Sequence, residues 1–278
     1  MKISSRTSEV IAKTLIWSAA IFVLAVLLFI IVHILANGLP VIDWQFLTDV
    51  PRNMGRDGGI SSTIVGTLLI TVVAVLIAAP FGIGTAFYLA EFTKESIVTR
   101  IIRFSAESLA GIPSIVYGLF GFIFFVIYLG MGWSVLSGGL TLAVMILPTI
   151  IRTSEEAIRS VPQIYREVSF SLSATKWQTI YKVVFPSALP GIVNGIILGV
   201  GRCIAETAAV MLTAGSVLRM PSSMFSPIRS MAVHFYILAR EGISMDNAYG
   251  TAALLIIIIF LINVVANTLV NRFMAKNR

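Results

Sequence analysis

The sequence has little of what a soluble enzyme usually carries. Only 12% of its 278 residues are charged, against about 25% in soluble domains. One cysteine, Cys203, excludes a disulfide within the chain, and the two histidines, His33 and His234, have no ligand partners at metal-binding spacing. No nucleophile with a base and an orienting group is visible, so no catalytic residue and no metal site is predicted. No P-loop G-x-x-x-x-G-K-[ST] occurs, so we expect no ATP site in this chain.

Apolar residues make up most of the chain. They account for 57% of it and give a mean hydropathy of +0.95, which indicates that lipid is the main solvent. Six apolar runs lie near the ~20 residues that cross a bilayer, and backbone groups in lipid must pair within the segment. The sequence therefore predicts an all-α polytopic membrane protein with six transmembrane helices. The runs are Thr14–Ala36, Ser61–Ala90, Phe104–Gly130, Gly138–Ile151 (the shortest), Gly191–Ala214 and Ala248–Val270.

The basic residues predict the orientation of these helices. If the runs alternate direction, fourteen of the 20 Lys and Arg residues lie on the side of both termini and five on the other side. Cytoplasmic loops carry the excess of positive charge, so both termini and residues 152–190 should be cytoplasmic. The net charge of +7 is thus explained by membrane topology and does not indicate nucleic-acid binding. The first run exceeds the 7–15 residues of a signal-peptide core, which favours a retained span.

Prolines and loop lengths refine the expected helices. Pro80 and Pro113 lie inside the second and third runs, where each removes a backbone donor and should kink its helix. The outer segments 37–60 and 215–247 are long enough for short surface helices.

A basic, hydroxyl-rich segment, REVSFSLSATKWQTIYKVVFPSALPGI, runs from Arg166 to Ile192 between two apolar runs. Within Lys176–Phe185 an apolar stripe has helical spacing, and a second stripe precedes it. We expect two short amphipathic helices joined near Ser171–Ala174, the second ended by Pro186, with Pro190 preceding the fifth span. The segment is either an interfacial loop in the lipid headgroups or a docking element for a partner protein. The stripes are Trp177, Ile180, Tyr181 and Val184, and Ile164, Val168 and Leu172.

This segment resembles the cytoplasmic signature loop of ABC importer permeases, E-A-A, three residues, G, nine residues, then I-x-L-P. Glu167, Val168 and Ser169 occupy the E-A-A positions, and Ser173 stands where glycine is expected. Glycine would allow a positive φ there, so Ser173 marks an ordinary bend or carries modest strain. The resemblance implies that the loop couples to an ATPase through Glu167, Ser173, Ala174, Trp177, Tyr181 and Pro186.

Other segments resemble the phosphate-specific permeases, and PstA more than its sister PstC. They are LAGIPSIVYGLFG at 109–121, GRCIAETAAVMLTAG at 201–215, which leans toward PstC at ETAAV, and FSPIRSMAVHFY at 225–236. The resemblance implies the type I ABC importer (MetI-like) permease fold. Residues 1–60 would form an N-terminal transmembrane helix and extracytoplasmic loop, and residues 61–278 a core of five transmembrane helices with a coupling loop near 152–190.

The same resemblance implies a function and partners. The chain would be a permease subunit of an ATP-driven phosphate importer in the bacterial inner membrane. It would pair with a PstC-like permease, two copies of a cytoplasmic ATPase that binds ATP and Mg, and an extracytoplasmic phosphate-binding protein. No cofactor is expected in this chain. Three alternatives stay open: a permease for sulfate or molybdate, a self-contained secondary transporter or channel, and a membrane enzyme.

Arg202 and Glu206 are the candidate substrate residues. They lie inside the fifth run, where a charge costs at least about 2.5–3.5 kcal/mol, and on a helix their four-residue spacing makes them neighbours. Gly191, Gly195 and Gly199 form a small-residue ridge, which predicts close packing against another helix. The charged pair is either an internal ion pair or a phosphate-handling site, in which Ser114 and Tyr117 beside Pro113 are further candidate donors. Glu107, Glu155, Glu156 and Arg159 are predicted to form interfacial or solvated surface.

Overall fold

The computed structural model describes residues 5–276, and within them every named element is helical. The all-α prediction is confirmed. The elements are α1 (Ser5–Gly38), η1 (Leu39–Val41), α2 (Trp44–Thr48), η2 (Asn53–Gly55), α3 (Ser61–Phe87), η3 (Tyr88–Phe92), α4 (Ile97–Ala110), α5 (Ser114–Gly121), η4 (Phe122–Tyr128), α6 (Val135–Arg159), α7 (Gln163–Ser171), α8 (Lys176–Thr179), η5 (Ile180–Val184), α9 (Phe185–Ala205), α10 (Ala208–Thr213), α11 (Met231–Arg240) and α12 (Met245–Lys276).

Five helical segments are long and apolar enough to cross a membrane, and a bent helix pair supplies a sixth. This agrees with the six predicted spans, but the fourth span is far longer than expected. The apolar run stops at Ile151, whereas α6 continues to Arg159, because charged residues extend the helix beyond its apolar part. Short helices also form in the two outer segments, as expected: α2 in the first and α11 in the second.

The third apolar run is broken rather than kinked. α4 and α5 meet at an angle of 100° across residues 111–113. Gly111 ends α4, and Pro113 directly precedes α5. A residue before proline disfavours the helical region, so Ile112 cannot continue α4. Pro80, by contrast, lies inside the continuous helix α3.

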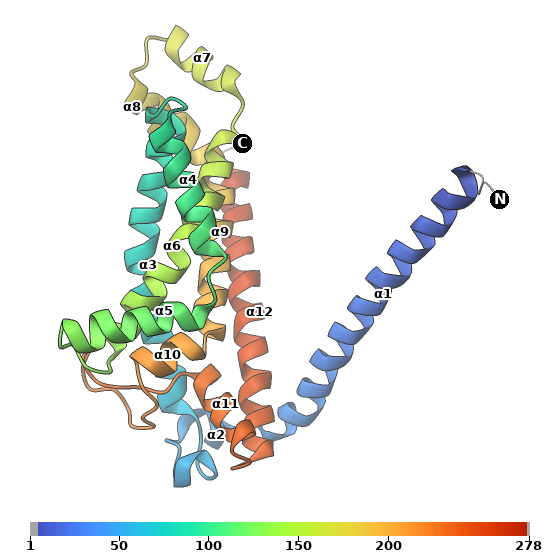
Figure 1. Ribbon diagram of the computed structural model, residues 1–278, viewed down its shortest axis with the longest axis vertical. Helices are drawn as coiled ribbons and strands as arrows, with labels where there is room; N and C mark the ends of the chain where they lie inside the picture. Colours follow the sequence, from blue (N-terminus) through green and yellow to red (C-terminus); the bar gives the residue numbers. More distant parts are fainter. Residues whose placement is uncertain (1–4, 277–278) are drawn as a thin grey trace.

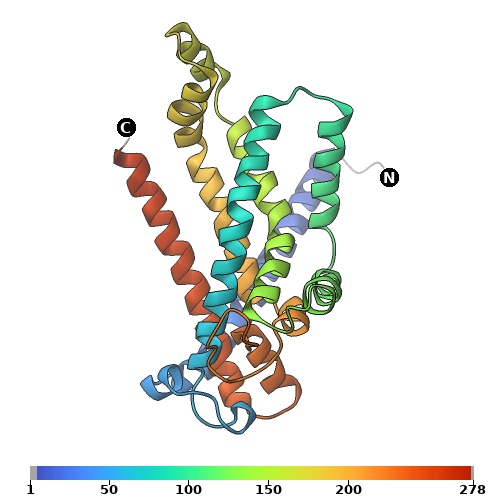
Figure 2. The ribbon, with the colours of Figure 1, turned by 90° about the vertical axis from the view of Figure 1, so that its left-hand side faces the viewer.

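Small residues let the central helices approach closely. α6 packs against both α3 and α9, which run alongside it in Figure 2. On α9, a methyl group added to Gly191 or Gly195 would collide with Ala157 or Thr153 of α6, and Gly199 faces Ile146. The prediction that this glycine ridge packs against another helix is therefore confirmed.

α1 leaves the bundle and contacts it only near one end. In Figure 1 this blue helix joins the other helices beside α12 and extends away from them. Gly38 packs against Tyr249 and Ala253, and the His33 and Tyr249 rings meet edge to face. The described ends of the chain lie at the end of the molecule that carries α7, whereas α2 and α11 lie at the opposite end (Figure 1).

Candidate functional site

The fifth apolar run is broken where its acidic residue lies. α9 ends at Ala205, and Glu206 has an extended backbone with ψ of 128°. Glu206 is buried, and its Oε1 atom accepts a hydrogen bond of 3.1 Å from the backbone N–H of Ala209 in the first turn of α10. An acidic side chain in this position satisfies a free N–H at a helix start. Glu206 thus caps α10 and is not on the helix that carries Arg202.

Of the two alternatives for Arg202 and Glu206, the internal ion pair does not form. Four-residue spacing makes two residues neighbours only on an unbroken helix, and α9 ends between them at Ala205. Arg202 lies half-buried in the last turn of α9, and no residue within 5–276 accepts a hydrogen bond from it or pairs with it. A half-buried guanidinium with all its N–H donors unused is suited to bind an anion bidentately.

The α4–α5 break places α5 against α10, the short helix that follows the break after α9. Tyr117 is buried on α5. Its O–H donates to the carbonyl oxygen of Leu109 at 2.7 Å, so this hydroxyl ties α5 to the end of α4. α5 reaches α10 through Gly118, which packs against Ala209.

Ser114 begins α5 and is half-buried. Within the described part of the chain its hydroxyl has no hydrogen-bond partner. The unused hydroxyl therefore lies on α5, which packs against α10, and the unused guanidinium lies at the end of α9, which leads into α10.

The loop at the opposite end of α9 has a well-defined fold. α7 ends before a turn, and Thr175 starts α8 with a reciprocal capping box, in which its hydroxyl accepts from the Gln178 N–H and Gln178 Oε1 accepts from the Thr175 N–H. The expected pair of short helices joined by an elbow is present. Pro186, however, does not end the second helix. The π-helix η5 leads directly into α9, so the chain runs as one helical segment through Pro186 and Pro190.

Ser173 has a φ of 60°, so the glycine-like conformation is kept without glycine. A residue with a Cβ atom is strained there by about 1–2 kcal/mol. Of the two alternatives for Ser173, an ordinary bend or modest strain, the structure therefore shows strain.

Replacing Ser173 with glycine is expected to raise the free energy of unfolding of the purified chain by about 0.5–1 kcal/mol, because relief of strain exceeds the added entropy of glycine. Thermal unfolding in detergent measures this change. Ser171→Gly is the matched control, since Ser171 is helical and its hydroxyl donates to the Glu167 carbonyl, and it should lower stability by about 0.5 kcal/mol. A lower midpoint for Ser173→Gly would contradict the strain argument.

The two apolar stripes of this loop face different surroundings. Ile180 and Val184 are buried, whereas Trp177 and Tyr181 are 71% and 73% exposed. Ile164 and Val168 on α7, and Leu172 directly after it, are also exposed. Glu167 is exposed and, among the described residues, its side chain has no bonding partner. Arg166 and Ser169 hold the elbow in place, and the sequence pattern predicts neither contact. Their partners are Glu91 and Thr179.

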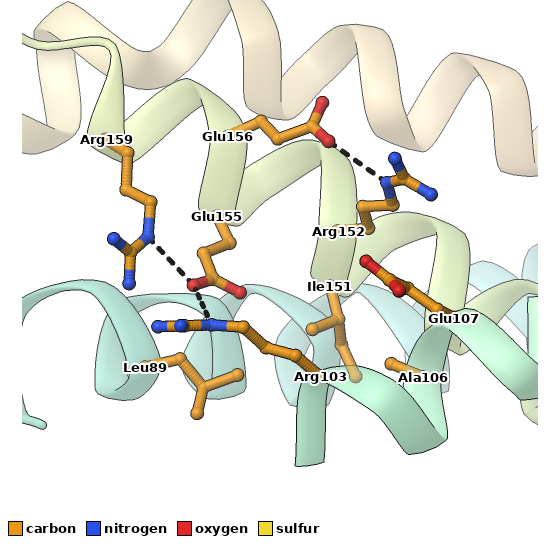
Figure 3. A pocket seen from close by; sticks show the side chains of 9 residues that line it. All are labelled: Leu89, Arg103, Ala106, Glu107, Ile151, Arg152, Glu155, Glu156 and Arg159. Carbon is orange, nitrogen blue, oxygen red and sulfur yellow. Dashed lines mark hydrogen bonds and ion pairs between the residues drawn. The ribbon is translucent and has the colours of Figure 1, made fainter. Parts of the chain in front are cut away.

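A charged pocket lies where α4 and α6 meet (Figure 3). Glu155 is buried and accepts hydrogen bonds from Arg103 Nε at 2.8 Å and Arg159 Nε at 2.9 Å. Its prediction as solvated surface is therefore wrong, because residue 155 faces α4. Glu156 is exposed, as expected, and pairs with the exposed Arg152, and Glu107 lines the same pocket.

His234, in the first half of α11, is fully buried. Burial, together with the nearby charge of Arg229, lowers the pKa of His234 to about 3, so the ring is neutral at physiological pH. Burial also lowers the pKa of Arg229, whose Nε donates to the Ser216 carbonyl. Within the described residues no cluster of His, Cys, Asp and Glu has the arrangement of a metal site.

Comparison with known proteins identifies the family. Residues 78–278 match the family of binding-protein-dependent transport system inner membrane components. The Bacillus subtilis "Probable ABC transporter permease protein YqgI" is 32% identical over 95% of both chains. The "Phosphate transport system permease protein PstA 1" of Mycobacterium tuberculosis is 36% identical over 80% of this chain and 73% of its own length.

Solved structures with the same fold are permease-containing ABC transporters. A chain of an inward-facing MetNI methionine ABC transporter aligns with a TM-score of 0.63 at 20% identity, over 77% of this chain and 95% of its own. A chain of a bacterial ABC transporter for alginate import aligns with a TM-score of 0.65 at 16% identity, over 96% and 99%. At these identities the likeness concerns the fold alone. Together with the family match, it shows that the chain belongs to the binding-protein-dependent transport system inner membrane components and is a multi-pass permease of the type I ABC importer fold.

Proposed function

We propose that this chain is a permease subunit of an ATP-driven phosphate importer, and that Arg202 handles the anion. Support for phosphate comes from relatives named as phosphate transport permeases, at 31–36% identity. The structural observation that carries the proposal is the unpaired, half-buried Arg202 in the last turn of α9, directly before the α9–α10 break. An unpaired guanidinium can replace part of the hydration that phosphate loses in the membrane.

Glu206 and Ser114 have supporting roles in this proposal. Glu206 fixes the break by capping α10, and its negative charge tempers the attraction for the anion so that it can be released. Ser114 adds one hydroxyl donor at the start of α5, and Tyr117 holds α5 against α4.

The partners in this proposal follow from the family and from the coupling loop. A second, PstC-like permease completes the translocation path. Two copies of a cytoplasmic ATPase bind ATP and Mg and dock on the exposed apolar residues of α7 and α8. A phosphate-binding protein delivers the solute to the outer face, on the side of α2 and α11.

The identity of the solute is tested by ATP hydrolysis. The chain is co-purified with its partner subunits in lipid discs, and binding protein loaded with phosphate, sulfate or molybdate is added. Phosphate should stimulate hydrolysis, and sulfate and molybdate should not. If only sulfate or only molybdate stimulates hydrolysis, that anion is the solute and the phosphate proposal is wrong. Solute transport by vesicles containing this chain alone, without ATP, would indicate a secondary transporter instead.

The orientation is tested by labelling single cysteines. In a Cys203→Ser background, a cysteine at Ser160, next to α7, should react with an impermeant thiol reagent only when the membrane is opened. A cysteine at Ser222, between α10 and α11, should react in intact cells. Both serines are exposed in the structure, so access depends on the side of the membrane. Labelling of the Ser160 position from outside would reverse the proposed orientation.

A further inference from the structure

A buried ion pair ties the coupling loop to the end of α3. Arg166 of α7 donates to Glu91 Oε1 of η3 from Nη2 at 2.6 Å and from Nε at 3.0 Å. The two side chains are only 11% and 10% exposed. Pairs at this depth are screened little by salt, and their geometry is fixed by two hydrogen bonds.

The same arginine also binds the end of α6. Its Nη1 donates to the Val161 carbonyl at 2.8 Å and its Nη2 to the Ile158 carbonyl at 3.0 Å. Carbonyl groups in the last turn of a helix lack the helical N–H four residues further on and favour a cation. One side chain thus joins three elements: α7, the end of α3 and the end of α6.

The rest of α7 is held weakly. Its outer residues Ile164, Val168 and Leu172 are 55%, 53% and 79% exposed. On its inner side, the hydroxyl groups of Ser169 and Thr179 share one hydrogen bond of 2.9 Å, which connects α7 to α8. Among the ion pairs of residues 5–276, that of Arg166 and Glu91 is the one that connects α7 to the membrane-spanning helices.

We propose that Arg166 is a positioning residue that makes α3 and α6 move together with α7. This inference rests on the proposed docking of an ATPase on α7. A displacement of α7 by the ATPase is carried through Arg166 to Glu91 and to the α6 carbonyls. α3 and α6 pack closely, for example where Gly82 meets Ile150 and Gly139 meets Val73, so the two helices respond as one body. Arginine is required because its planar fork reaches the carboxylate and both carbonyls at once, which lysine cannot do.

The test separates coupling from folding. Arg166→Gln or Glu91→Gln alone leaves a buried charge without its partner, which destabilises the assembly. The double variant Arg166→Gln/Glu91→Gln removes both charges and should assemble like the wild type. We expect its solute-stimulated ATP hydrolysis to fall about tenfold, within the range by which residues along a coupling path change coupling, while hydrolysis without solute is unchanged. Arg166→Lys keeps the positive charge, so it should assemble better than Arg166→Gln, but its solute-stimulated ATP hydrolysis should stay below that of the wild type.

The control is Arg152→Gln/Glu156→Gln, which removes a cytoplasmic-end pair whose side chains are 58% and 65% exposed and should change neither quantity. Wild-type stimulation in the Arg166/Glu91 double variant would overturn the inference. A cysteine at Leu172 that crosslinks to the ATPase in the double variant supports the docking proposal independently. Absence of that crosslink in the wild-type background would instead reject the docking on which the inference rests.

Discussion

Replacing Arg202 with glutamine is expected to leave the transporter assembled and to lower its solute uptake about ten- to a hundredfold. A hydrogen bond to a charged group contributes about 1.5–3 kcal/mol, and about 1.4 kcal/mol corresponds to a tenfold change. Assembly should survive because Arg202 has no bonding partner within residues 5–276. Its loss therefore strands no carboxylate, since Glu206 is already bonded to the Ala209 N–H.

The measurement is uptake divided by the amount of assembled complex. Arg202→Lys keeps the charge but not the bidentate geometry, so it should retain part of the uptake. Glu206→Gln keeps an oxygen acceptor for the Ala209 N–H and should preserve the α9–α10 break, so it tests separately the negative charge that tempers the attraction for the anion. Wild-type uptake per complex in Arg202→Gln/Glu206→Gln would rule out anion handling by this arginine.

An aspartate at Val168 or Leu172 should leave the chain inserted and folded but separate it from its ATPase. Val168 on α7 and Leu172 at its end are both exposed, so a charge at either position costs this chain little. In a docked complex the same charge would be buried in an apolar contact, and disrupting a central contact typically costs at least about 2 kcal/mol. The expected result is loss of ATPase co-purification and of transport together. Ala174→Asp and Trp177→Asp, on the elbow and on α8, should act in the same direction.

Ile97→Asp is the control for this series. Ile97 is as exposed as Leu172 but begins α4, where an acidic residue is favoured by the helix dipole. It should leave ATPase binding unchanged. If all four loop variants co-purify with the ATPase and transport at the wild-type rate, the loop is an element of the lipid interface and not a docking site.

The sequence predicted those features that depend on composition and regular spacing. The spans are runs of apolar residues, and the glycine ridge of α9 follows from three glycines at four-residue spacing. The elbow between α7 and α8 follows from two helical stripes. Each of these properties is local, so the residues that produce it are close together in the chain.

The errors concern interactions between segments and breaks in helices. Glu155 is predicted to be solvated, but Arg103, 52 positions earlier, faces it across α4 and α6. The Arg166–Glu91 pair spans 75 positions and has no local signal. The break at Glu206 contains neither glycine nor proline, so spacing alone placed it on one helix with Arg202. Pro186 gives the opposite error. It is predicted to end a helix, but the helix continues through it because the wider turn of the preceding π-helix η5 accommodates it.

The unequal burial of the spans has a consequence for how the chain is made. The span of α1 has a mean hydropathy of 3.1 and is 0% buried within the chain, whereas that of α6 has a mean hydropathy of 1.8 and is 61% buried. A nascent α1 can leave the translocation machinery for bulk lipid by itself. α6 carries buried polar groups such as Ser154 and Glu155, and it reaches comparable stability only when α3 and α9 surround it. Synthesis therefore places this weakly apolar helix between an earlier helix and a later one, and its integration waits for the later one to emerge.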